Sequence, residues 1–271
     1  MRVEGKTVVV TGGGSGMGRE LVLQLLTRGA RVAAVDVLPA ALQETAALAH
    51  AGDRLSLHTV DITDSAAVAA LVDVVRGAHG DVDAVINNAG IIQPFVPVND
   101  LDLQHIRRVL DVNLMGTLYM VKAFLPVLLE RPEAHIANVS SMGGFFPFPG
   151  QSVYGASKAA VKLLTEGLYA ELLDTRVGVS VIMPGAVSTA ITENSGVAAP
   201  ATAGEAPRMP MTSAPRAAQI MLDGIERNRL YIFVGKDARL MNIAIRLAPR
   251  PAIGFIQKQM RSMLSRESTP A

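Results

Sequence analysis

The sequence contains no cysteine among its 271 residues. This absence excludes disulfide bonds, thiolate metal sites and cysteine nucleophiles, and it fits a reducing compartment. The start of the chain, MRVEGKTVVVTGG, lacks the apolar stretch and small-residue cleavage site of a secretory signal, and no run approaches ~18 apolar residues. We therefore expect a soluble protein of the cytoplasm.

The chain also has little net charge and no evident metal ligands. Its formal net charge is +1, which gives the molecule as a whole no nucleic-acid-binding character. We expect no metal, because the histidines show no paired ligand spacing. They are His50, His58, His79, His105 and His135.

What the sequence does contain begins with a strand, a glycine turn and a helix. Residues 6–11 (KTVVVT) form a β-branched run typical of a buried parallel strand, GGGSGMG follows at 12–18, and a helical apolar pattern extends to about residue 27. Glycine lets backbone N–H groups approach a pyrophosphate, and a helix start attracts one. The pattern predicts a dinucleotide site, although a merely flexible turn would give the same pattern.

Strand and helix patterns then alternate along the chain. The alternation predicts an α/β fold, a Rossmann-type doubly wound parallel sheet of about seven strands, in a single domain at 1–235. Further strands are predicted at 30–35, 55–60, 82–86, 134–139 and 177–182, and helices at 39–50, 64–77, 103–129 and from about 151. Ligands of such sheets lie at the carboxyl ends of the strands. The residues that fall at these ends are Asp36, Asp61, Asn87, Ser141 and Pro184.

Asp36 follows the second predicted strand, 18 residues after Gly18. A carboxylate there can accept both ribose hydroxyls of an adenosine and repels a 2′-phosphate. None of Ser15, Val37 and Leu38 supplies a cation that would neutralise such a phosphate. The sequence therefore favours NAD over NADP, with a solvated loop position for Asp36 as the alternative.

The stretch 138–162 carries the candidate catalytic side chains Ser141, Tyr154 and Lys158. Its second half suits a helix, which places Lys158 one turn from Tyr154 on the same face. A nearby ammonium lowers the pKa of a phenol from its usual value of about 10. We therefore expect Tyr154 to act as a general acid or base, although this Tyr and Lys spacing also occurs by chance.

Together these motifs resemble the short-chain dehydrogenase/reductase family over about residues 5–235. The motifs that carry the resemblance are TGxxxGxG at 11–18, NNAG at 87–90, Asn113, Ser141 thirteen residues before Tyr154, YxxxK at 154–158, and PG at 184–185 followed by Thr189. Their spacing differs from the TGxxGxxG of the larger sugar-nucleotide epimerases and from the longer Tyr-to-Lys spacing of the enoyl reductases.

The resemblance implies a catalytic set of Asn113, Ser141, Tyr154 and Lys158. Tyr154 would exchange the proton, and Ser141 would polarise the substrate oxygen. Lys158 would hold the nicotinamide ribose and depress the pKa of Tyr154, and Asn113 would support a water in a proton relay. The thirteen-residue offset selects Ser141 over Ser140, which we expect to pack or to cap.

The resemblance also implies a cofactor site and an activity. The activity is hydride transfer between NAD(H) and a secondary alcohol or ketone, carried out by a homodimer or homotetramer. Met17 stands where a branched aliphatic residue is commoner, at little cost because Met is adaptable. The implied cofactor-binding residues are Gly12, Gly14, Ser15, Gly16, Met17, Gly18, Asp36, Asp61, Ile62, Asn88, Ala89, Gly90, Tyr154, Lys158, Pro184, Gly185, Val187 and Thr189.

Residues 186–215 are rich in small and helix-breaking residues and form too long a stretch for an ordinary connection. We expect a lid that orders on substrate binding. Apolar side chains of this lid and of the stretch after Ser141 would line a pocket for a lipophilic substrate, steroid-like or long-chain. Core packing is the alternative for each of them. They are Met142, Phe145, Phe146, Phe148, Met209 and Met211.

The C-terminal segment 227–266 has nine Lys or Arg against a single acid, Asp237. Its net charge of +8 leaves −7 for the rest of a chain whose total is +1. Apolar residues interleave with the cations in the predicted helical extension 236–271. Such helices can cover a neighbouring subunit, close over the substrate pocket or lie on an anionic membrane. We favour packing or a subunit contact, with peripheral membrane contact as the alternative.

Two other classes of function stay open. A non-catalytic NAD-binding sensor or scaffold would use the same fold, and loss of Ser141, Tyr154 or Lys158 would mark it. All three residues are present. A lipid-surface binding protein, with the C-terminal tail as its functional part, would bind without turnover.

Overall fold

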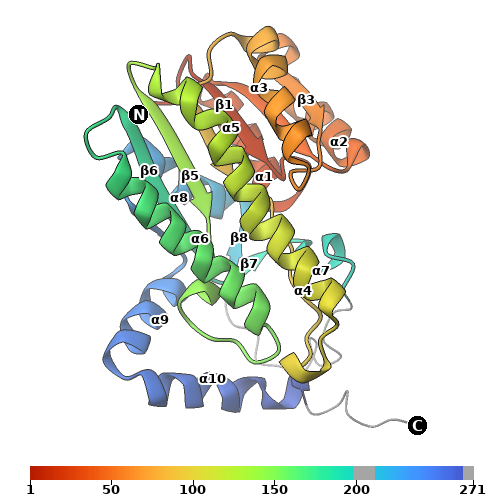
Figure 1. Ribbon diagram of the computed structural model, residues 1–271, viewed down its shortest axis with the longest axis vertical. Coiled ribbons are helices and arrows are strands. Elements are labelled where there is room, and N and C mark those ends of the chain that lie inside the picture. Colours follow the sequence, from red (N-terminus) through yellow and green to blue (C-terminus); the bar gives the residue numbers. More distant parts are fainter. Residues whose placement is uncertain (198–210, 265–271) are drawn as a thin grey trace.

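A seven-stranded parallel sheet forms the centre of the molecule (Figure 1). The computed structural model describes residues 1–197 and 211–264, with side chains up to residue 260. Strand order is β3-β2-β1-β4-β5-β6-β9, and every neighbouring pair is parallel. The strands are β1 Thr7–Thr11, β2 Arg31–Asp36, β3 Leu55–Thr59, β4 Ala84–Asn87, β5 Ala134–Val139, β6 Val177–Pro184 and β9 Tyr231–Val234. The predicted doubly wound sheet is confirmed.

Helices cover both faces of the sheet (Figure 1). One face carries α1 Gly16–Thr27, α2 Pro39–Ala49 and α8 Ala214–Glu226, and the other carries α3 Ser65–His79, α4 Leu103–Leu110, α5 Thr117–Leu129 and α6 Ser152–Glu171. Beyond these layers lie a two-stranded pair, β7 Val187–Ser188 and β8 Thr212–Ser213, and the short helix α7 Ile191–Asn194. The last two described helices are α9 Lys236–Leu247 and α10 Pro249–Leu264.

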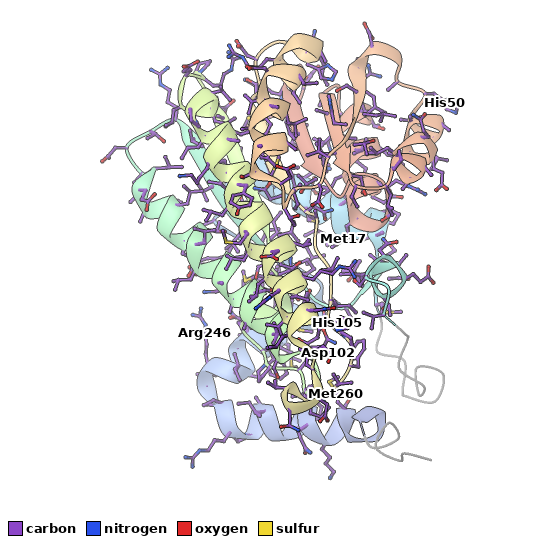
Figure 2. The ribbon with its side chains drawn as sticks, turned by 45° about the vertical axis from the view of Figure 1, so that its right-hand side comes forward. Met17, His50, Asp102, His105, Arg246 and Met260 are labelled. Atoms are coloured by element: carbon purple, nitrogen blue, oxygen red, sulfur yellow. The ribbon has the colours of Figure 1, made fainter. Side chains whose placement is uncertain are left out.

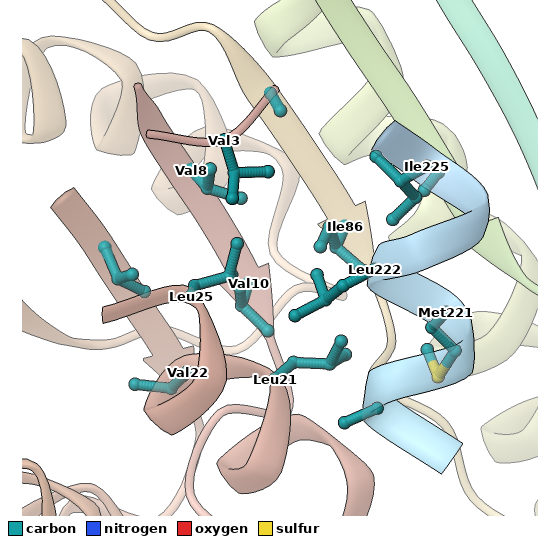
Figure 3. Close-up of a cluster of buried hydrophobic side chains, with 14 of the residues drawn as sticks. Val3, Val8, Val10, Leu21, Val22, Leu25, Ile86, Met221, Leu222 and Ile225 are labelled. Carbon is teal, nitrogen blue, oxygen red and sulfur yellow. The ribbon is translucent and has the colours of Figure 1, made fainter. Parts of the chain in front are cut away.

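The β-branched run of β1 explains why the sheet is buried on both faces. Successive side chains of a strand point to opposite faces. Val8 and Val10 accordingly pack against α1 and α8, in the cluster that Figure 3 shows, whereas Val9 packs in the cluster beneath α3 and α5. All three are almost completely buried, which holds the end of β1, and the turn that follows it, in a fixed position.

The predicted helix over 103–129 is helical throughout but is not uniform. Between α4 and α5 the residues Asp111–Gly116 form a π-helical turn, which widens the helix locally. Among the described residues, Leu103–Leu129 is the one helix long and apolar enough to cross a membrane, and 39% of its most apolar window is buried. Met120 and Phe124 are completely buried against the sheet, so core packing accounts for part of this apolar character.

The boundaries predicted from the sequence lie within two residues of the observed ones for six strands. The seventh, β9, was counted in the prediction but not located. The expected irregular stretch 186–215 is shorter than predicted, because β8 occupies 212–213 and α8 already begins at Ala214. The part of this stretch at 198–210, which includes Met209, lies outside the described residues.

The predicted C-terminal helices α9 and α10 form one side of a third apolar cluster. Ala238 of α9 and Ala252 and Ile256 of α10 are buried against Met142 and Phe146. Figure 2 shows Met260 between α10 and the body of the molecule, while other side chains project from α10 to the outside. The inner faces of both helices therefore pack, as favoured from the sequence.

Candidate active site

A cleft of about 300 Å³ lies at the carboxyl ends of β1, β2, β3 and β4. Most of the predicted cofactor residues line it: Gly12, Ser15, Gly16, Met17, Asp36, Asp61, Ile62, Asn88, Ala89, Gly90 and Thr189. Val37 and Leu38, named from the sequence as positions without a cation, also line it, and the lining residues that sequence reasoning did not name are Val35, Ala41, Val60, Ile91, Arg108, Val112, Ile191 and Asn194. Val35 and Val60 fall at predicted strand ends and could have been found, whereas Arg108 and Asn194 gave no signal.

Asp36 ties the end of β2 to the glycine turn. Its Oδ2 accepts a hydrogen bond from Gly14 N at 2.9 Å, and its Oδ1 accepts one from Leu38 N at 3.1 Å. Asp36 is the last residue of β2 and is half-buried, so the solvated loop position considered from the sequence is wrong. A carboxylate has about four acceptor sites, so Asp36 keeps free capacity toward the cleft.

The glycine turn leaves no room for side chains at two positions. A Cβ at Gly18 would lie 1.8 Å from Gly12 O, and Gly12 itself has a φ of +67°. Thr11 Oγ1 accepts from Asn88 N at 3.0 Å and from Ala89 N at 3.1 Å, which joins the NNAG segment to the turn. The result is a cradle of backbone beside the start of α1 that fits a pyrophosphate.

The residues predicted to bind but not lining this cleft lie beside it. They are Gly14, Gly18, Tyr154, Lys158, Pro184, Gly185 and Val187. Pro184 ends β6, Gly185 N donates to Val234 O at 2.8 Å, and Val187 belongs to β7. This segment leads to Thr189, which does line the cleft, so it runs from the end of β6 to the cleft edge.

Ser141 and Tyr154 meet at the turn that follows β5. Ser141 Oγ accepts a hydrogen bond from Gly143 N at 3.0 Å. A Cβ built on Gly143 would lie 3.4 Å from Ser141 Oγ and 3.2 Å from Tyr154 Cε1, so Gly143 lets the two side chains come together. Ser140 Oγ instead donates to Lys158 O at 2.7 Å and is buried, in agreement with its expected packing role.

Burial shifts the pKa values of Tyr154 and Lys158, the two candidate catalytic side chains on α6. Tyr154 is half-buried as a whole, but burial of its hydroxyl end raises its pKa, and a hydrogen bond with Ser141 opposes this only in part. Lys158 is buried, which lowers its pKa from 10.5 to about 8, and its Nζ donates to Val139 O at 3.0 Å. Burial and the Ser141 hydrogen bond are the causes of the Tyr154 shift, and a lowering of its pKa by Lys158 stays a prediction.

Asn113 lies in the π-helical turn and is completely buried. Its Oδ1 accepts from Ile91 N at 2.9 Å, and its Nδ2 donates to Ile91 O and to Ser157 Oγ, both at 3.0 Å. A Cβ at Gly90 would lie 3.2 Å from Asn113 Oδ1 and 2.9 Å from Lys158 Nζ. Asn113 and Lys158 thus face one small space beside Gly90, while the water relay stays a prediction.

The apolar residues expected to form a substrate pocket have mixed positions. Phe146 is 0% exposed and Met142 is 8% exposed, so both belong to the packed cluster under α9 and α10. The core-packing alternative is therefore correct for these two. Phe145 and Phe148 are half-buried at the edge of the same cluster, and Met211 is 59% exposed.

Many known proteins are similar to this chain in sequence or in fold. The sequence profile described as short chain dehydrogenase matches residues 6–199. The chain is 36% identical over 256 residues to the Mycobacterium tuberculosis protein named "Putative oxidoreductase SadH", covering 90% of this chain and 91% of that one. It is 37% identical over 246 residues to the 1-deoxy-11-beta-hydroxypentalenate dehydrogenase of Streptomyces avermitilis, covering 88% of each.

Solved structures agree with this assignment. A short-chain dehydrogenase/reductase from Burkholderia phymatum, in complex with NAD, is 30% identical with a TM-score of 0.81 and covers 91% of this chain and 96% of its own. A short-chain dehydrogenase from Burkholderia cenocepacia, in complex with NADP, is 29% identical with a TM-score of 0.80 and covers 94% and 99%. The cradle at the glycine turn and these neighbours support a nicotinamide dinucleotide as the cofactor. The chain belongs to the short-chain dehydrogenase/reductase family of oxidoreductases.

Proposed function

We propose that the protein is an NAD-dependent dehydrogenase or carbonyl reductase that interconverts a secondary alcohol and a ketone. The observation that carries the proposal is the close approach of Ser141 and Tyr154 at Gly143. They meet after the end of β5, the neighbour of β4, and β4 is one of the strands whose ends form the cleft that Asp36 borders. A bound nicotinamide would supply the hydride acceptor or donor. The protein's own residues would bind and orient both partners and would move the proton.

Tyr154 would exchange its phenolic proton with the substrate oxygen, and the Ser141 hydroxyl would donate a hydrogen bond to that oxygen. The raised pKa of Tyr154 keeps its phenol protonated at neutral pH, which suits proton donation during ketone reduction. In the oxidative direction Tyr154 must first lose that proton. Alcohol oxidation is therefore expected to speed up as the pH rises above neutrality, in initial rates measured at saturating cofactor.

The choice of NAD over NADP is proposed from Asp36. Its carboxylate borders the cleft and retains acceptor capacity that ribose hydroxyls can use, while a 2′-phosphate would meet its negative charge. Arg108 is a cation of the same cleft, but it belongs to α4 and its Nη1 donates to Ser195 O at 3.5 Å. The adenosine side of the cleft is therefore taken to be acidic.

Paired fluorescence titrations with NADH and NADPH test this choice. Wild type is expected to bind NADH at least tenfold more tightly, a difference of about 1.4 kcal/mol. Asp36→Ala should lose most of this preference, while Asp53→Ala, an exposed carboxylate elsewhere on the chain, should keep it. Tighter binding of NADPH by wild type would overturn the use made of Asp36.

A lipophilic substrate, steroid-like or long-chain, is the proposed class. Phe145 and Phe148 flank the turn that carries Ser141 and are half-buried, so both can contribute apolar surface. The Streptomyces avermitilis relative, whose name gives a hydroxylated compound that it dehydrogenates, supports a hydroxyl as the reacting group. NAD-linked turnover over a panel of alcohols of increasing apolar size tests the class, which predicts that kcat/KM rises with size.

A homodimer or homotetramer is proposed for the assembly. The outward sides of α5 and α6 carry exposed apolar side chains, with Leu129 at 47%, Leu163 at 69% and Tyr169 at 39%. Large exposed apolar residues on neighbouring helices are typical of subunit contacts. Light scattering after size exclusion should give two or four chains, and Leu163→Glu should lower that number.

Peripheral contact of a cytoplasmic protein with an anionic membrane is the second candidate. It is favoured by exposed apolar residues interleaved with exposed cations on α9 and α10. The apolar ones are Leu240, Ile243, Leu247, Ile253 and Phe255, and the cations are Lys236, Arg239, Arg246, Arg250 and Lys258. Truncation would uncover Phe146, so point substitutions are the better test.

Flotation with liposomes that contain anionic lipid decides on this contact. Wild type should float at low salt and less at high salt, and Leu247→Glu with Phe255→Glu should abolish flotation. Val74→Glu on α3, at an exposed apolar residue outside both proposed contacts, is the matched control and should float like wild type. Absence of flotation at low salt would rule out the membrane contact.

In the turnover experiment, NADH binding with no turnover across the panel of alcohols would favour the sensor or scaffold function instead.

A further inference from the structure

Asp237 is the one acid among nine cations in the segment 227–266. It lies in the first turn of α9, directly after β9. In the described contacts, none of these cations is an ion-pair or hydrogen-bond partner of its carboxylate. Asp237 Oδ2 instead accepts a hydrogen bond from Ala186 N at 2.7 Å.

Ala186 occupies the middle of the segment that leads from β6 to the cleft. Its N–H is taken by Asp237, and its carbonyl oxygen accepts from Thr212 N at 2.9 Å. The preceding Gly185 N donates to Val234 O at 2.8 Å. The segment is therefore fastened to β9, to α9 and to β8 within two residues, a short distance before Thr189 enters the cleft lining.

Two glycines make room for the Asp237 carboxylate. A Cβ at Gly185 would lie 2.2 Å from Asp237 Oδ2, and a Cβ at Gly235 would lie 2.2 Å from Asp237 Oδ1. Gly235 also has a φ of +99°, a backbone conformation that side chains disfavour. The carboxylate thus sits in a close-fitting position formed by both segments, and not at the tip of a freely rotating side chain.

We propose that Asp237 is a positioning residue that holds residues 184–189 in the shape that binds the nicotinamide end of the cofactor. This inference rests on the proposed function and on the cofactor-binding role that the family resemblance implies for this segment. A hydrogen bond to an ionised acceptor is stronger than one between neutral groups. The C-terminal segment is thereby coupled to cofactor binding through one carboxylate, although none of its helices lines the described cleft.

NADH titration of two Asp237 variants tests the proposal. Asp237→Ala removes the acceptor and should weaken NADH binding about tenfold. Asp237→Asn keeps a neutral acceptor, so its NADH affinity should lie between that of wild type and that of Asp237→Ala. Lys236→Ala, at the exposed neighbouring position, is the control and should bind NADH like wild type. Thermal unfolding with and without NADH separates a positioning role from a general loss of stability. A positioning role predicts that NADH raises the melting temperature of Asp237→Ala less than that of wild type.

Amide hydrogen exchange of wild type keeps the proposal testable even where a variant fails to fold. The Ala186 amide should be protected without cofactor and more protected with NADH. Free exchange of this amide, or equal NADH affinity of wild type and Asp237→Ala, would overturn the role of Asp237 and leave the proposed function standing. Absence of NADH binding by wild type would instead overturn the proposed function.

Discussion

The glycine turn after β1 and the paired helices α9 and α10 both follow the carboxyl end of a strand, but different forces hold them. Backbone hydrogen bonds and glycine contacts fix the turn, where a Cβ at Gly18 would lie 1.8 Å from Gly12 O. The two helices are held by an apolar inner face, and at Gly254 of α10 a Cβ would have nothing within 4 Å. The turn is specified by position, the helices by surface chemistry.

This difference explains which part of the function is visible in the sequence. A turn with no space for side chains requires particular residues at particular spacings, and such spacings form motifs. A helix that packs through a few apolar side chains leaves its other face free, so its composition fits several partners. The contrast predicts large effects from small changes in the turn and small effects on the outer face of α10.

The largest expected loss of stability is in the apolar cluster that α9 and α10 cover. Phe146 is 0% exposed, so Phe146→Ala should lower the free energy of unfolding by about 3–5 kcal/mol. Phe255 is 54% exposed on α10, and Phe255→Ala should change it by about 0.5 kcal/mol or less. Chemical denaturation of both variants measures the pair, and equal losses would show that α10 is not placed as described.

Matched alanine substitutions at two glycines sharpen the comparison. Gly18→Ala should cost about 3 kcal/mol, since the new methyl group would meet Gly12 O and Asn88 Nδ2. It should also weaken NADH binding. Gly254→Ala is expected to stabilise α10 by about 0.5–1 kcal/mol, because alanine is the better helix former. A neutral Gly18→Ala variant with normal NADH affinity would refute the tight turn.

A smaller effect concerns pH and His135 of β5, which lies outside both regions. Burial, together with a smaller contribution from the nearby N-terminal ammonium, lowers the pKa of His135 from 6.5 to about 3. As the pH falls below 6.5 the unfolded chain takes up this proton first, so stability is lost in the window from about 6.5 toward 3. Between pH 6.5 and 5 the loss should be about 1.5 kcal/mol.

Urea unfolding at several pH values, on wild type and His135→Gln, measures this effect. The variant cannot titrate at that position and should lose correspondingly less stability over the same window. The remaining histidines serve as the internal control. Parallel pH profiles of the two proteins would show that His135 is not buried uncharged between β5 and β6.

The sequence predicted the sheet because its strands are short β-branched runs that end in polar or glycine residues. Because strand ends of a parallel sheet meet at one edge, the sequence also predicted Asp36 and Asp61 of the cleft lining, and the family resemblance implied most of its other predicted residues. The family resemblance identified Ser141 over Ser140, and the observed hydrogen bond from Ser140 Oγ to Lys158 O agrees. These predictions depend on local pattern, on chain order and on the spacing of motifs that the family shares.

Other features depend on distances between segments, which no local pattern contains. Burial raises the pKa of Tyr154, and burial is not visible in the spacing of residues along α6. Phe146 has an apolar aromatic side chain that would suit a substrate pocket, but it is packed in the cluster that includes α10. The contact of Asp237 with Ala186 joins residues 51 positions apart. Each needed the packing of elements that are separate in the sequence.

The proposed function assigns the proton transfer to Tyr154, in a reaction whose cofactor the cleft binds. NADH affinity and NAD-linked turnover of an accepted alcohol, measured together on wild type and Tyr154→Phe, test this role most directly. Turnover of Tyr154→Phe should be lower by about 10²- to 10⁴-fold, with NADH affinity within about twofold of wild type. Wild-type turnover by Tyr154→Phe, with NADH still bound, would contradict it.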